Sequence, residues 1–250
     1  MESPCFIIVA DTLNWIAEAM TEMLAPTRRR GIELLDDPAI DPRIVTRSMS
    51  DVARANSILG GTRAAMSELR SVLADLPRVA TLLDVGTGAG DIPERACRDA
   101  AKAGVTLWTI GIDLAEPLVQ MHRDRHGAVV RGDALRLPFG DASVDIVMCS
   151  QLLHHFLTGD AVMLVREMNR VARTRVLISD LRRSWVAAGG IWVMSFALGF
   201  HKVSRHDGVV SVMRGFLKNE LADIVEAAVG VRPRVRQRPG FRLTTSWSPE

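Results

Sequence analysis

Residues 82–90 read Leu-Leu-Asp-Val-Gly-Thr-Gly-Ala-Gly, an apolar segment that ends in an acid and continues with three glycines at alternate positions. Glycine has no Cβ, so Gly86, Gly88 and Gly90 allow the backbone to turn tightly and to approach a ligand closely. Residues 92–103 have helical composition, and a helix that starts after such a loop presents N–H groups without partners. The pattern predicts a site for a nucleoside-containing cofactor.

The spacing of these glycines separates two classes of cofactor. Loops that bind dinucleotides have the pattern G-x-G-x-x-G, whereas this chain has G-x-G-x-G with Asp84 two residues before the first glycine. A carboxylate in that position would repel a diphosphate and would attract an ammonium or a sulfonium group. We therefore expect a cationic cofactor.

Two further apolar segments end in an acid. Residues 106–113 predict a second strand that ends at Asp113, about the offset expected for a carboxylate that binds ribose. Residues 129–134 predict another short strand, which ends near Asp133, and residues 143–150 predict a fourth strand. Each acid alone could be a turn former, but the glycine loop and both acids in this order favour a cofactor site.

With these motifs in this order, the chain resembles the class I S-adenosylmethionine-dependent methyltransferases from about residue 45 to residue 247, and within them the small-molecule branch that includes the ubiquinone and menaquinone C-methyltransferases. The resemblance implies a Rossmann-like α/β fold: a seven-stranded, mostly parallel sheet with an antiparallel C-terminal hairpin, helices on both faces and a helical N-terminal cap. It implies S-adenosyl-L-methionine as the cofactor. We expect a cap and entry segment over residues 1–70 and a methyltransferase domain over residues 71–250, with a lid insertion at about residues 182–215.

The same resemblance implies roles for the site residues. The loop from Gly86 to Gly90 would lie under the methionine part of the cofactor. Asp113 would take both ribose hydroxyls and Leu114 would pack on the adenine. Asp133 would accept from the adenine amino group, and Ala134 would use its backbone N–H. The expected cofactor-binding residues are Asp84, Gly86, Thr87, Gly88, Gly90, Asp113, Leu114, Asp133, Ala134, Ser150 and Gln151.

Two consecutive histidines follow the fourth strand and are candidates for a catalytic base. Methyl transfer needs an acceptor atom in line with the methyl group, and a base where a proton must leave. Imidazole titrates near neutral pH, and the chain has no tyrosine that could act instead. We expect His155 to face the acceptor and His154 to pack or cap, although either could only bind backbone. The residues expected around the acceptor are Arg47, Asn56, His154 and Arg182.

No metal site is predicted. Two adjacent histidines do not offer the spaced, convergent ligands that zinc needs. The three cysteines lie far apart, so they predict neither a disulfide framework nor a zinc site.

Residues 185–200 are apolar and carry no charge. The segment is shorter than the roughly 20 residues that span a bilayer. Three interpretations stay open: a buried core helix, a hydrophobic lid over the acceptor, and a helix on a membrane surface. We favour the lid, because three glycines weaken a core helix and because the resembled family varies its substrate cover here.

Other segments are predicted to be structural. Residues 11–35 have helical spacing, and Arg28-Arg29-Arg30 near its end is expected to be a solvated helix terminus. A second helix is predicted over residues 48–59, before Gly60-Gly61. Arginines alternate over residues 231–238, and a solvated edge strand protected by its charge is favoured over a nucleic-acid stripe, because the net charge is only +2.

Length and composition fit one enzyme domain, with 250 residues of which 48% are hydrophobic. The first residues show no signal peptide pattern, so we expect a cytoplasmic protein without a transmembrane segment. We predict methyl transfer to a small, apolar, aromatic or quinone- or polyketide-like acceptor, on carbon or oxygen, without a nucleic-acid partner. The alternatives are an RNA or protein methyltransferase and a non-catalytic S-adenosylmethionine-binding regulator. A peripheral membrane contact and the oligomeric state are left open.

Overall fold

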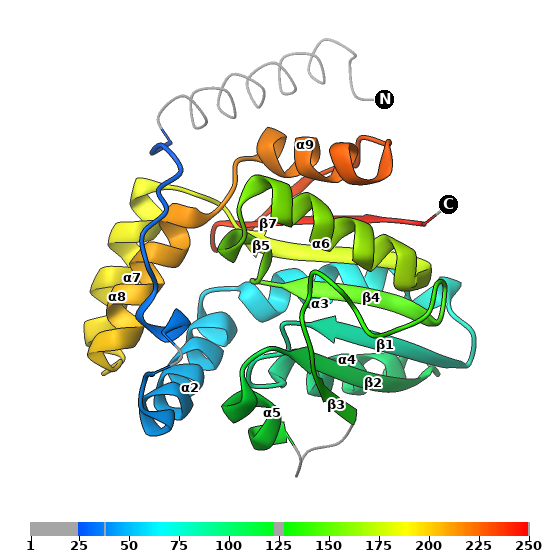
Figure 1. The fold of residues 1–250 in the computed structure, drawn as a ribbon, viewed down its shortest axis with the longest axis horizontal. Helices are drawn as coiled ribbons and strands as arrows, with labels where there is room; N and C mark the ends of the chain where they lie inside the picture. The colour runs from blue at the N-terminus through cyan, green and yellow to red at the C-terminus, as the bar shows by residue number, and fades with distance from the viewer. Residues whose placement is uncertain (1–24, 38, 123–127, 250) are drawn as a thin grey trace, which may run out of the picture.

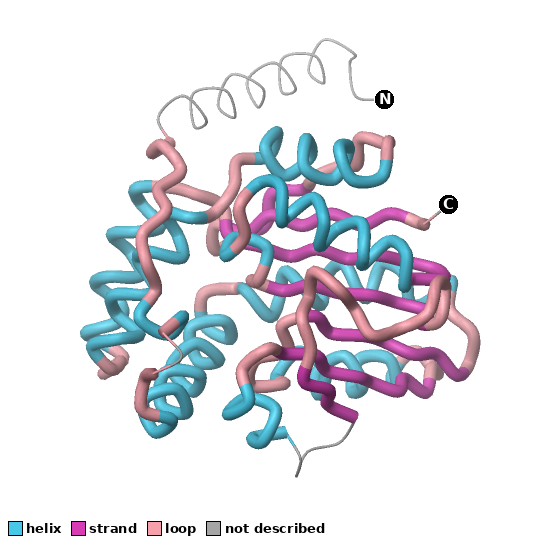
Figure 2. Tube along the Cα trace, viewed as in Figure 1, coloured by secondary structure: helices cyan, strands magenta, loops and turns pink. Residues whose placement is uncertain are grey.

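A seven-stranded sheet organises the chain, of which a computed structural model describes residues 25–37, 39–122 and 128–249. The strands lie in the order β3-β2-β1-β4-β5-β7-β6 (Figures 1 and 2). Neighbours among β1 to β5 pair in parallel, whereas β7 pairs antiparallel with both β5 and β6. The predicted fold class is confirmed. The strands are β1 (Val79–Val85), β2 (Thr106–Asp113), β3 (Ala128–Arg131), β4 (Val144–Ser150), β5 (Ala172–Leu181), β6 (Arg236–Arg238) and β7 (Arg242–Trp247).

Helices cover both faces of this sheet (Figure 1). One apolar cluster packs α6 and α9 against one face, and a second packs α3 and α4 against the other. The α-helices are α2 (Pro42–Ile58), α3 (Gly61–Val72), α4 (Asp91–Lys102), α5 (Glu116–His122), α6 (Thr158–Val171), α7 (Trp185–Ala197), α8 (Lys202–Arg214) and α9 (Lys218–Val229). The short 3-10 helices are η1 (Leu34–Asp36), η2 (Leu73–Asp75) and η3 (Leu153–His155).

The central strand β4 shows why the sequence reads as continuous apolar runs. Its residues are buried from Val144 to Cys149, on both sides of the sheet. Strands of a parallel sheet that is covered on both faces need apolar side chains in both directions. The carboxyl ends of such strands are the usual place for ligands in an open α/β sheet.

Helices α2, α7 and α8 lie at the carboxyl ends of the parallel strands (Figure 1). Residues 25–37, which we call the N-terminal strap, run beside α8. Asp207 of α8 accepts hydrogen bonds from Leu34 N and Leu35 N at 2.8 and 2.9 Å. These bonds hold η1, which is part of the strap, against α8.

The helix predicted over residues 11–35 lies mostly outside the described residues, and its described part, residues 25–35, contains no α-helix but only the start of η1. Arg28 is not a solvated helix end. Its Nε donates to Arg214 O of α8 at 2.7 Å, and its guanidinium lies 4.3 Å from the centre of the Phe216 ring. Arg28 does lie at the carbonyl end of a helix, as the helix dipole favours for a cation. That helix is α8 and not the helix predicted over residues 11–35.

The helix predicted from residue 48 begins earlier, at Pro42, because Asp41 caps it by accepting from Arg43 N. It ends at Ile58, just before Gly60, close to the predicted end. Helix α3 was not predicted, and it packs against β5 and β7 of the sheet. The division of the chain at residue 70 stays a prediction.

The arginines of residues 231–238 form a shorter strand than predicted, and this strand, β6, is an edge strand of the sheet, as predicted. Arg236 Nη1 and Arg238 Nη2 donate to the Glu68 carboxylate at 3.1 and 2.6 Å. Glu68 belongs to α3 and is 1% exposed. Thr244 Oγ1 of β7 donates to the same carboxylate at 2.6 Å. The predicted edge position is thus confirmed, whereas the predicted solvation is wrong for Arg236 and Arg238, because these side chains bind a buried acid of α3.

Replacing Glu68 tests how much this cluster stabilises the hairpin. Glu68→Ala leaves two partly buried arginines without their acid, so we expect the free energy of unfolding in urea to fall by about 3 kcal/mol at neutral pH. Burial raises the pKa of Glu68, but hydrogen bonds from Thr244 and Arg238 and the charge of Arg236 outweigh it and leave the pKa lowered.

A carboxyl with a lowered pKa stabilises the fold above its unfolded pKa, and this contribution is lost as the pH falls through the folded pKa. The difference between wild type and Glu68→Ala should therefore shrink in acid. Glu94 is the control, since it pairs with Arg98 in an exposed position. Glu94→Ala should cost less than about 0.5 kcal/mol, and equal losses for the two variants would contradict the role of Glu68.

Candidate active site

The glycine-rich loop lies between β1 and α4. Gly86, Gly88 and Gly90 all have positive φ, at 72°, 51° and 71°. Gly86 has the least space, since a Cβ there would lie 2.7 Å from Leu152 Cδ2. Gly86 N donates to Ile112 O at 2.9 Å and ties the loop to β2. A side chain at residue 86 would therefore disrupt both the turn and its packing.

Asp84 is a buried acid directly before this loop. It is 2% exposed, and its Oδ1 has no hydrogen-bond partner. Burial raises its pKa to about 7, and the charges of Asp91 and Asp113 act in the same direction against a hydrogen bond from the Thr87 side chain. A buried carboxylate oxygen without a partner is suited to an ammonium or sulfonium group. The residues present therefore fit the cationic cofactor expected from the sequence.

Asp113 closes β2 beside the loop. Its Oδ2 accepts from Gly88 N at 3.1 Å and its Oδ1 accepts from Ala115 N at 3.0 Å. Each carboxylate oxygen has a further lone pair, so Asp113 can orient the loop and also accept from hydroxyls. The next residue, Leu114, is 64% exposed, which leaves its side chain accessible to a ring.

Asp133 and Ala134 follow β3 on the next strand of the sheet. Asp133 is exposed and its Oδ1 accepts from Leu135 N at 2.9 Å, the turn-forming contact that was the structural alternative. Its Oδ2 accepts no hydrogen bond from any described residue. The acids of residues 84, 113 and 133 thus lie at the carboxyl ends of three adjacent strands, and their individual roles stay predictions.

The end of β4 carries two unusual features. Ser150 Oγ is buried without a hydrogen-bond partner. Gln151 has a φ of 55°, which is uncommon for a residue other than glycine, and its N–H donates to Ser179 O at 2.8 Å. Strain of this kind tends to occur at functional sites. Gln151 also faces the start of α3, since a Cβ on Gly61 would lie 2.8 Å from its Nε2.

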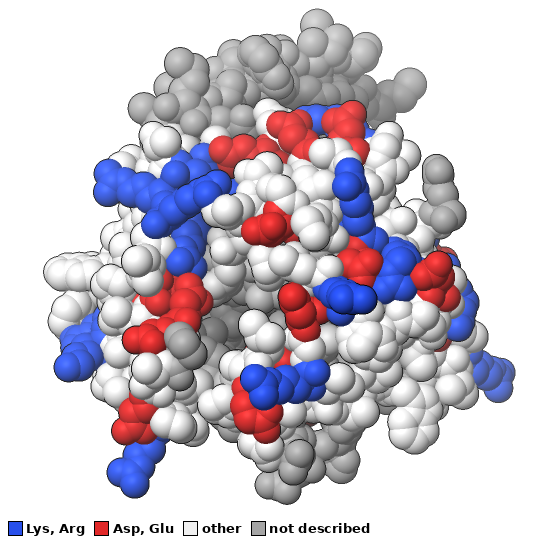
Figure 3. Space-filling view, viewed as in Figure 1, with Lys and Arg blue, Asp and Glu red and all other residues white. Residues whose placement is uncertain are grey.

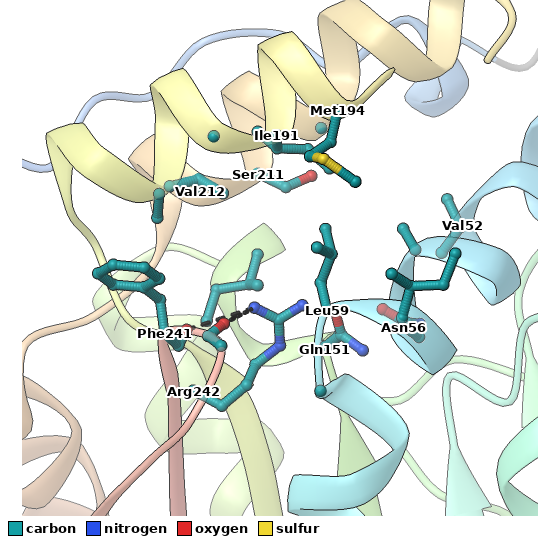
Figure 4. Close-up of a pocket in the computed structure, with 18 of the residues that line it drawn as sticks. Val52, Asn56, Leu59, Gln151, Ile191, Met194, Ser211, Val212, Phe241 and Arg242 are labelled. Atoms are coloured by element: carbon teal, nitrogen blue, oxygen red, sulfur yellow. Dashed lines mark hydrogen bonds between the residues drawn. The ribbon is translucent and has the colours of Figure 1, made fainter. Parts of the chain in front are cut away.

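A cavity of about 460 Å³ lies beside Gln151, between α2, α7, α8 and the C-terminal hairpin (Figure 4). Most of its lining is apolar and includes Val52, Leu59, Ile191, Met194, Val212 and Phe241. Its polar lining residues are Asn56, Arg63, Gln151, Ser204, Ser211 and Arg242. Its size and character suit a small organic ligand. Among the described residues that line it, none has a carboxylate or an imidazole side chain.

The residues predicted around the acceptor are only partly brought together. Asn56 lines the cavity and is 8% exposed. Arg47 instead donates to Gly199 O at 3.2 Å, and Arg182 Nη1 donates to Gln237 Oε1 at 2.7 Å. Neither arginine is among the residues that line the cavity.

His154 and His155 face the N-terminal strap rather than the cavity. His154 Nδ1 lies 2.7 Å from Asp180 Oδ1, while its buried Nε2 has no hydrogen-bond partner. His155 Nδ1 lies 3.4 Å from Asp36 Oδ1 and its Nε2 lies 3.8 Å from Glu33 Oε2. Burial opposes a charge on His155, but Asp36 and Glu33 outweigh it and raise the pKa of the imidazole. The predicted role of His155 as a base stays a prediction.

The two histidines do converge, contrary to the expectation for consecutive residues. Ligand atoms of Glu33, His154 and His155 all lie within 4.8 Å of one another. The tight turn of η3 and the bond to Asp180 bring both rings toward Glu33. Arg214 Nη1 lies 3.0 Å from Glu33 Oε1 and competes for that carboxylate. The prediction of no metal rested on a wrong geometric premise and stays untested.

Arg242, the first residue of β7, was missed by the sequence reasoning. It is 6% exposed, lines the cavity, and has a buried Nε without a hydrogen-bond partner. Burial lowers the pKa of its guanidinium to about 10, although the charge of Asp180 opposes the shift. The available signal was an arginine directly after a Pro-Gly-Phe turn. Its burial depends on how the hairpin packs against α3 and against Leu59 and Gly60 before it, which the local pattern does not contain.

Helix α7 forms most of the uncharged segment of residues 185–200 and ends at Ala197. Only Ala188 and Ser195 of the helix are buried, whereas Trp185 and Trp192 are 54% and 55% exposed. The core-helix interpretation is therefore wrong. The side of α7 that carries Ile191 lines the cavity, which the lid interpretation requires. No helix of the described residues has the length and apolarity to cross a membrane.

Comparison with known proteins agrees with this geometry. Residues 83–178 match a family model described as a methyltransferase domain. The chain is 33% identical over 118 residues to a demethylmenaquinone methyltransferase of Roseiflexus sp. (strain RS-1). This alignment covers 44% of this chain and 45% of that protein. The chain is 31% identical over 108 residues to a probable tRNA methyltransferase 9B of Mus musculus, which covers 43% of this chain and 22% of that protein. The chain thus spans less than half the length of these relatives.

Solved structures share the fold. A SAM-dependent methyltransferase from Aquifex aeolicus aligns with a TM-score of 0.56 at 18% identity, over 84% of this chain and 100% of that chain. A SAM-dependent methyltransferase from Thermotoga maritima, titled a possible histamine N-methyltransferase, aligns with a TM-score of 0.53 at 18% identity, over 83% and 99%. The predicted resemblance is confirmed at the level of the domain and the fold: residues 83–178 match a methyltransferase domain, and the sheet has the fold of solved SAM-dependent methyltransferases.

Asp84 predicts a pH dependence of cofactor affinity. A bound cation favours the ionised carboxylate, so binding releases a proton below the pKa of about 7. Calorimetry should show that S-adenosylmethionine binds more tightly as the pH rises from 5.5 to 7.5 and then levels off. Asp84→Asn should remove this rise and weaken binding at pH 8 by more than about 1.4 kcal/mol. Glu94→Gln, on the exposed side of α4, is the control, and a flat wild-type profile would contradict the role of Asp84.

His155 predicts a different pH dependence, that of stability. Because its pKa is raised by Asp36 and Glu33, its contribution is complete below the unfolded pKa and is lost as the pH rises through the folded value. His155→Gln should therefore lower the free energy of unfolding by about 1 kcal/mol at pH 6 and by much less at pH 9. A loss independent of pH would contradict the charged contact. Wild-type turnover in this variant would also remove His155 as a base.

Proposed function

We propose that the protein is a class I S-adenosylmethionine-dependent methyltransferase that methylates a small, apolar acceptor in the cavity between α2, α7, α8 and the hairpin. One observation carries the proposal: the cavity and the cofactor loop share a wall. Gln151 lines the cavity, and the next residue, Leu152, lies against Gly86 of the loop. An acceptor in the cavity would therefore lie close to the methionine part of the cofactor.

In this proposal, one set of residues binds the cofactor and another set binds the acceptor. Asp84 would hold the positive end of the cofactor, Asp113 its ribose and Asp133 its adenine. When bound, the cofactor supplies an electrophilic methyl group. Apolar walls such as Leu59 and Phe241 exclude water and restrict the orientation of the acceptor, and positioning of this kind accounts for much of the rate in such transfers.

The acceptor is proposed to be aromatic, quinone-like or polyketide-like, with methylation on carbon or oxygen. The cavity is predominantly apolar, and the relatives include proteins named demethylmenaquinone methyltransferase. A polar metabolite would leave most of its hydrogen bonds unmade against such walls.

An RNA acceptor is the second candidate, because other relatives are named probable tRNA methyltransferase 9B. Its expected footprint was the arginine segment at residues 231–238. Arg236 and Arg238 are instead bound to Glu68. On the face drawn in Figure 3, one group of Lys and Arg is gathered at the upper left, and the other Lys and Arg lie beside Asp and Glu. The contacts with Glu68 favour the small acceptor.

Transfer of a labelled methyl group tests the proposal. The protein is incubated with methyl-labelled S-adenosylmethionine and with separate lipid-soluble, polar and RNA fractions of a cell extract. Label is expected in the lipid-soluble, low-molecular-weight fraction. Label in RNA would support the second candidate, and cofactor binding without labelling of any fraction would contradict an enzymatic role.

Two tryptophan variants on α7 test the location of the acceptor. Met194 faces the cavity, whereas its neighbour Val193 is 58% exposed on the outer side. Met194→Trp should reduce methyl transfer at least tenfold by filling the cavity, while cofactor affinity stays within about twofold. Val193→Trp should leave both unchanged. Equal activity of the two variants would place the acceptor elsewhere.

A further inference from the structure

We propose that Arg242 forms an anion-binding subsite in the acceptor cavity, so that the acceptor carries an ionised oxygen, such as a phenolate, an enolate or a carboxylate. The inference rests on the proposed function and modifies its acceptor class: the acceptor is apolar over most of its surface and carries one ionised oxygen. It starts from a contrast between the two buried arginines of the described chain, Arg183 and Arg242.

Arg183 has a complete set of partners. It is 4% exposed, and its Nη1 and Nη2 donate to the Glu220 carboxylate at 2.9 and 2.8 Å. Its Nε donates to the Pro26 carbonyl oxygen. A buried guanidinium is normally stabilised in this way, because an unpaired buried charge is costly.

Arg242 lacks such a partner. Its Nη1 donates to Gly240 O at 2.6 Å and to Phe241 O at 3.4 Å, and neither acceptor is charged. Its buried Nε has no partner, and its Nη2 donates to no described residue. No carboxylate of the described residues pairs with it. The N–H groups of Nη2 therefore remain for an oxygen ligand.

Asp180, the acid whose charge acts on Arg242, already has hydrogen-bond partners of its own. The charge of Asp180 favours the Arg242 cation through space. Asp180 Oδ1, however, contacts His154 Nδ1 at 2.7 Å and accepts from Leu181 N at 2.6 Å, and its Oδ2 accepts from His154 N at 3.2 Å. These contacts hold Asp180 toward η3, so it does not supply the missing hydrogen bonds to Arg242.

The position of Arg242 identifies the ligand as the acceptor. Figure 4 shows its side chain rising from β7 toward the space bounded by Leu59, Met194 and Val212. Gln151 lines the same space from the end of β4. An aromatic anion would place its rings against the apolar walls and its oxygen on the guanidinium, where a low dielectric strengthens the contact.

This subsite also explains how transfer proceeds in a cavity whose described lining has no carboxylate and no imidazole. An acceptor that binds as the anion has already released its proton to solvent. Its electron pair can form the bond to the methyl carbon directly, as the bond from that carbon to the cofactor sulfur breaks and leaves the thioether. Arg242 would favour the ionised acceptor, and no protein base is required.

Two probes of the same shape test the subsite without knowledge of the natural acceptor. Calorimetry compares 1-naphthoate, an aromatic anion, with 1-naphthamide, its neutral isostere, on protein saturated with S-adenosylhomocysteine. Wild type should bind naphthoate at least about tenfold more tightly, the scale of a charge-assisted hydrogen bond. Equal affinities, or no binding of either probe, would overturn the proposal.

Variants then assign the preference to one side chain. Arg242→Met should bind both probes alike, and Arg242→Lys should retain part of the preference because it keeps the charge. Arg98→Met removes an exposed arginine of α4 and should behave as wild type. A preference that survives in Arg242→Met overturns the subsite, and the wild-type comparison still decides if that variant fails to fold.

The cofactor separates this proposal from the general one. Affinity for S-adenosylmethionine is measured on the same preparations. If wild type does not bind S-adenosylmethionine, the proposed function is contradicted. A preference for naphthoate, measured on the same protein without cofactor, would still support the subsite. Normal cofactor binding with no naphthoate preference would overturn the subsite alone.

Discussion

The carboxylate of Asp180 is the buried charge on which both halves of the site depend. It is fully buried at the carboxyl end of β5. Burial raises its pKa, but the charge and hydrogen bond of His154 outweigh burial and leave the pKa lowered. Through His154 it fixes η3, which follows the cofactor-side end of β4. Through its charge it stabilises Arg242 on the cavity side.

Other segments are fixed to the sheet by the same kind of contact. Glu68 holds β6 and β7 against α3 through Arg236 and Arg238, and Glu220 holds the start of α7 through Arg183. A buried ion pair contributes little net stability compared with apolar packing, but it is costly to break. We therefore infer that these pairs fix the positions of the hairpin and of the start of α7 relative to the helices against which they lie, positions that apolar packing alone would specify less strictly.

The sequence predicted the parts of the fold that are governed by local pattern. The strands around the glycine loop were predictable because a sheet covered on both faces needs apolar runs, and the loop because positive φ requires glycine. Glu68 and Arg242 were not predictable, because each lies within an ordinary helix or strand pattern. The burial of Glu68 arises from contacts with residues more than 100 positions away, such as Arg238, and that of Arg242 from the pairing of β7 with β5. The same reason explains why Arg236 and Arg238 were mistaken for solvated residues.

Helix α7 shows why an uncharged segment can be neither core nor membrane span. Its inner side, with Ile191 and Met194, must be apolar because it lines the cavity. Its outer side exposes Trp192 and Phe196, and Arg205 lies 4.4 Å from the centre of the Phe196 ring. A helix that forms the wall of an apolar cavity has few neighbours against which to bury its second side. The lack of charge that marked residues 185–200 in the sequence therefore reflects two separate apolar surfaces, of which the inner one lines the cavity.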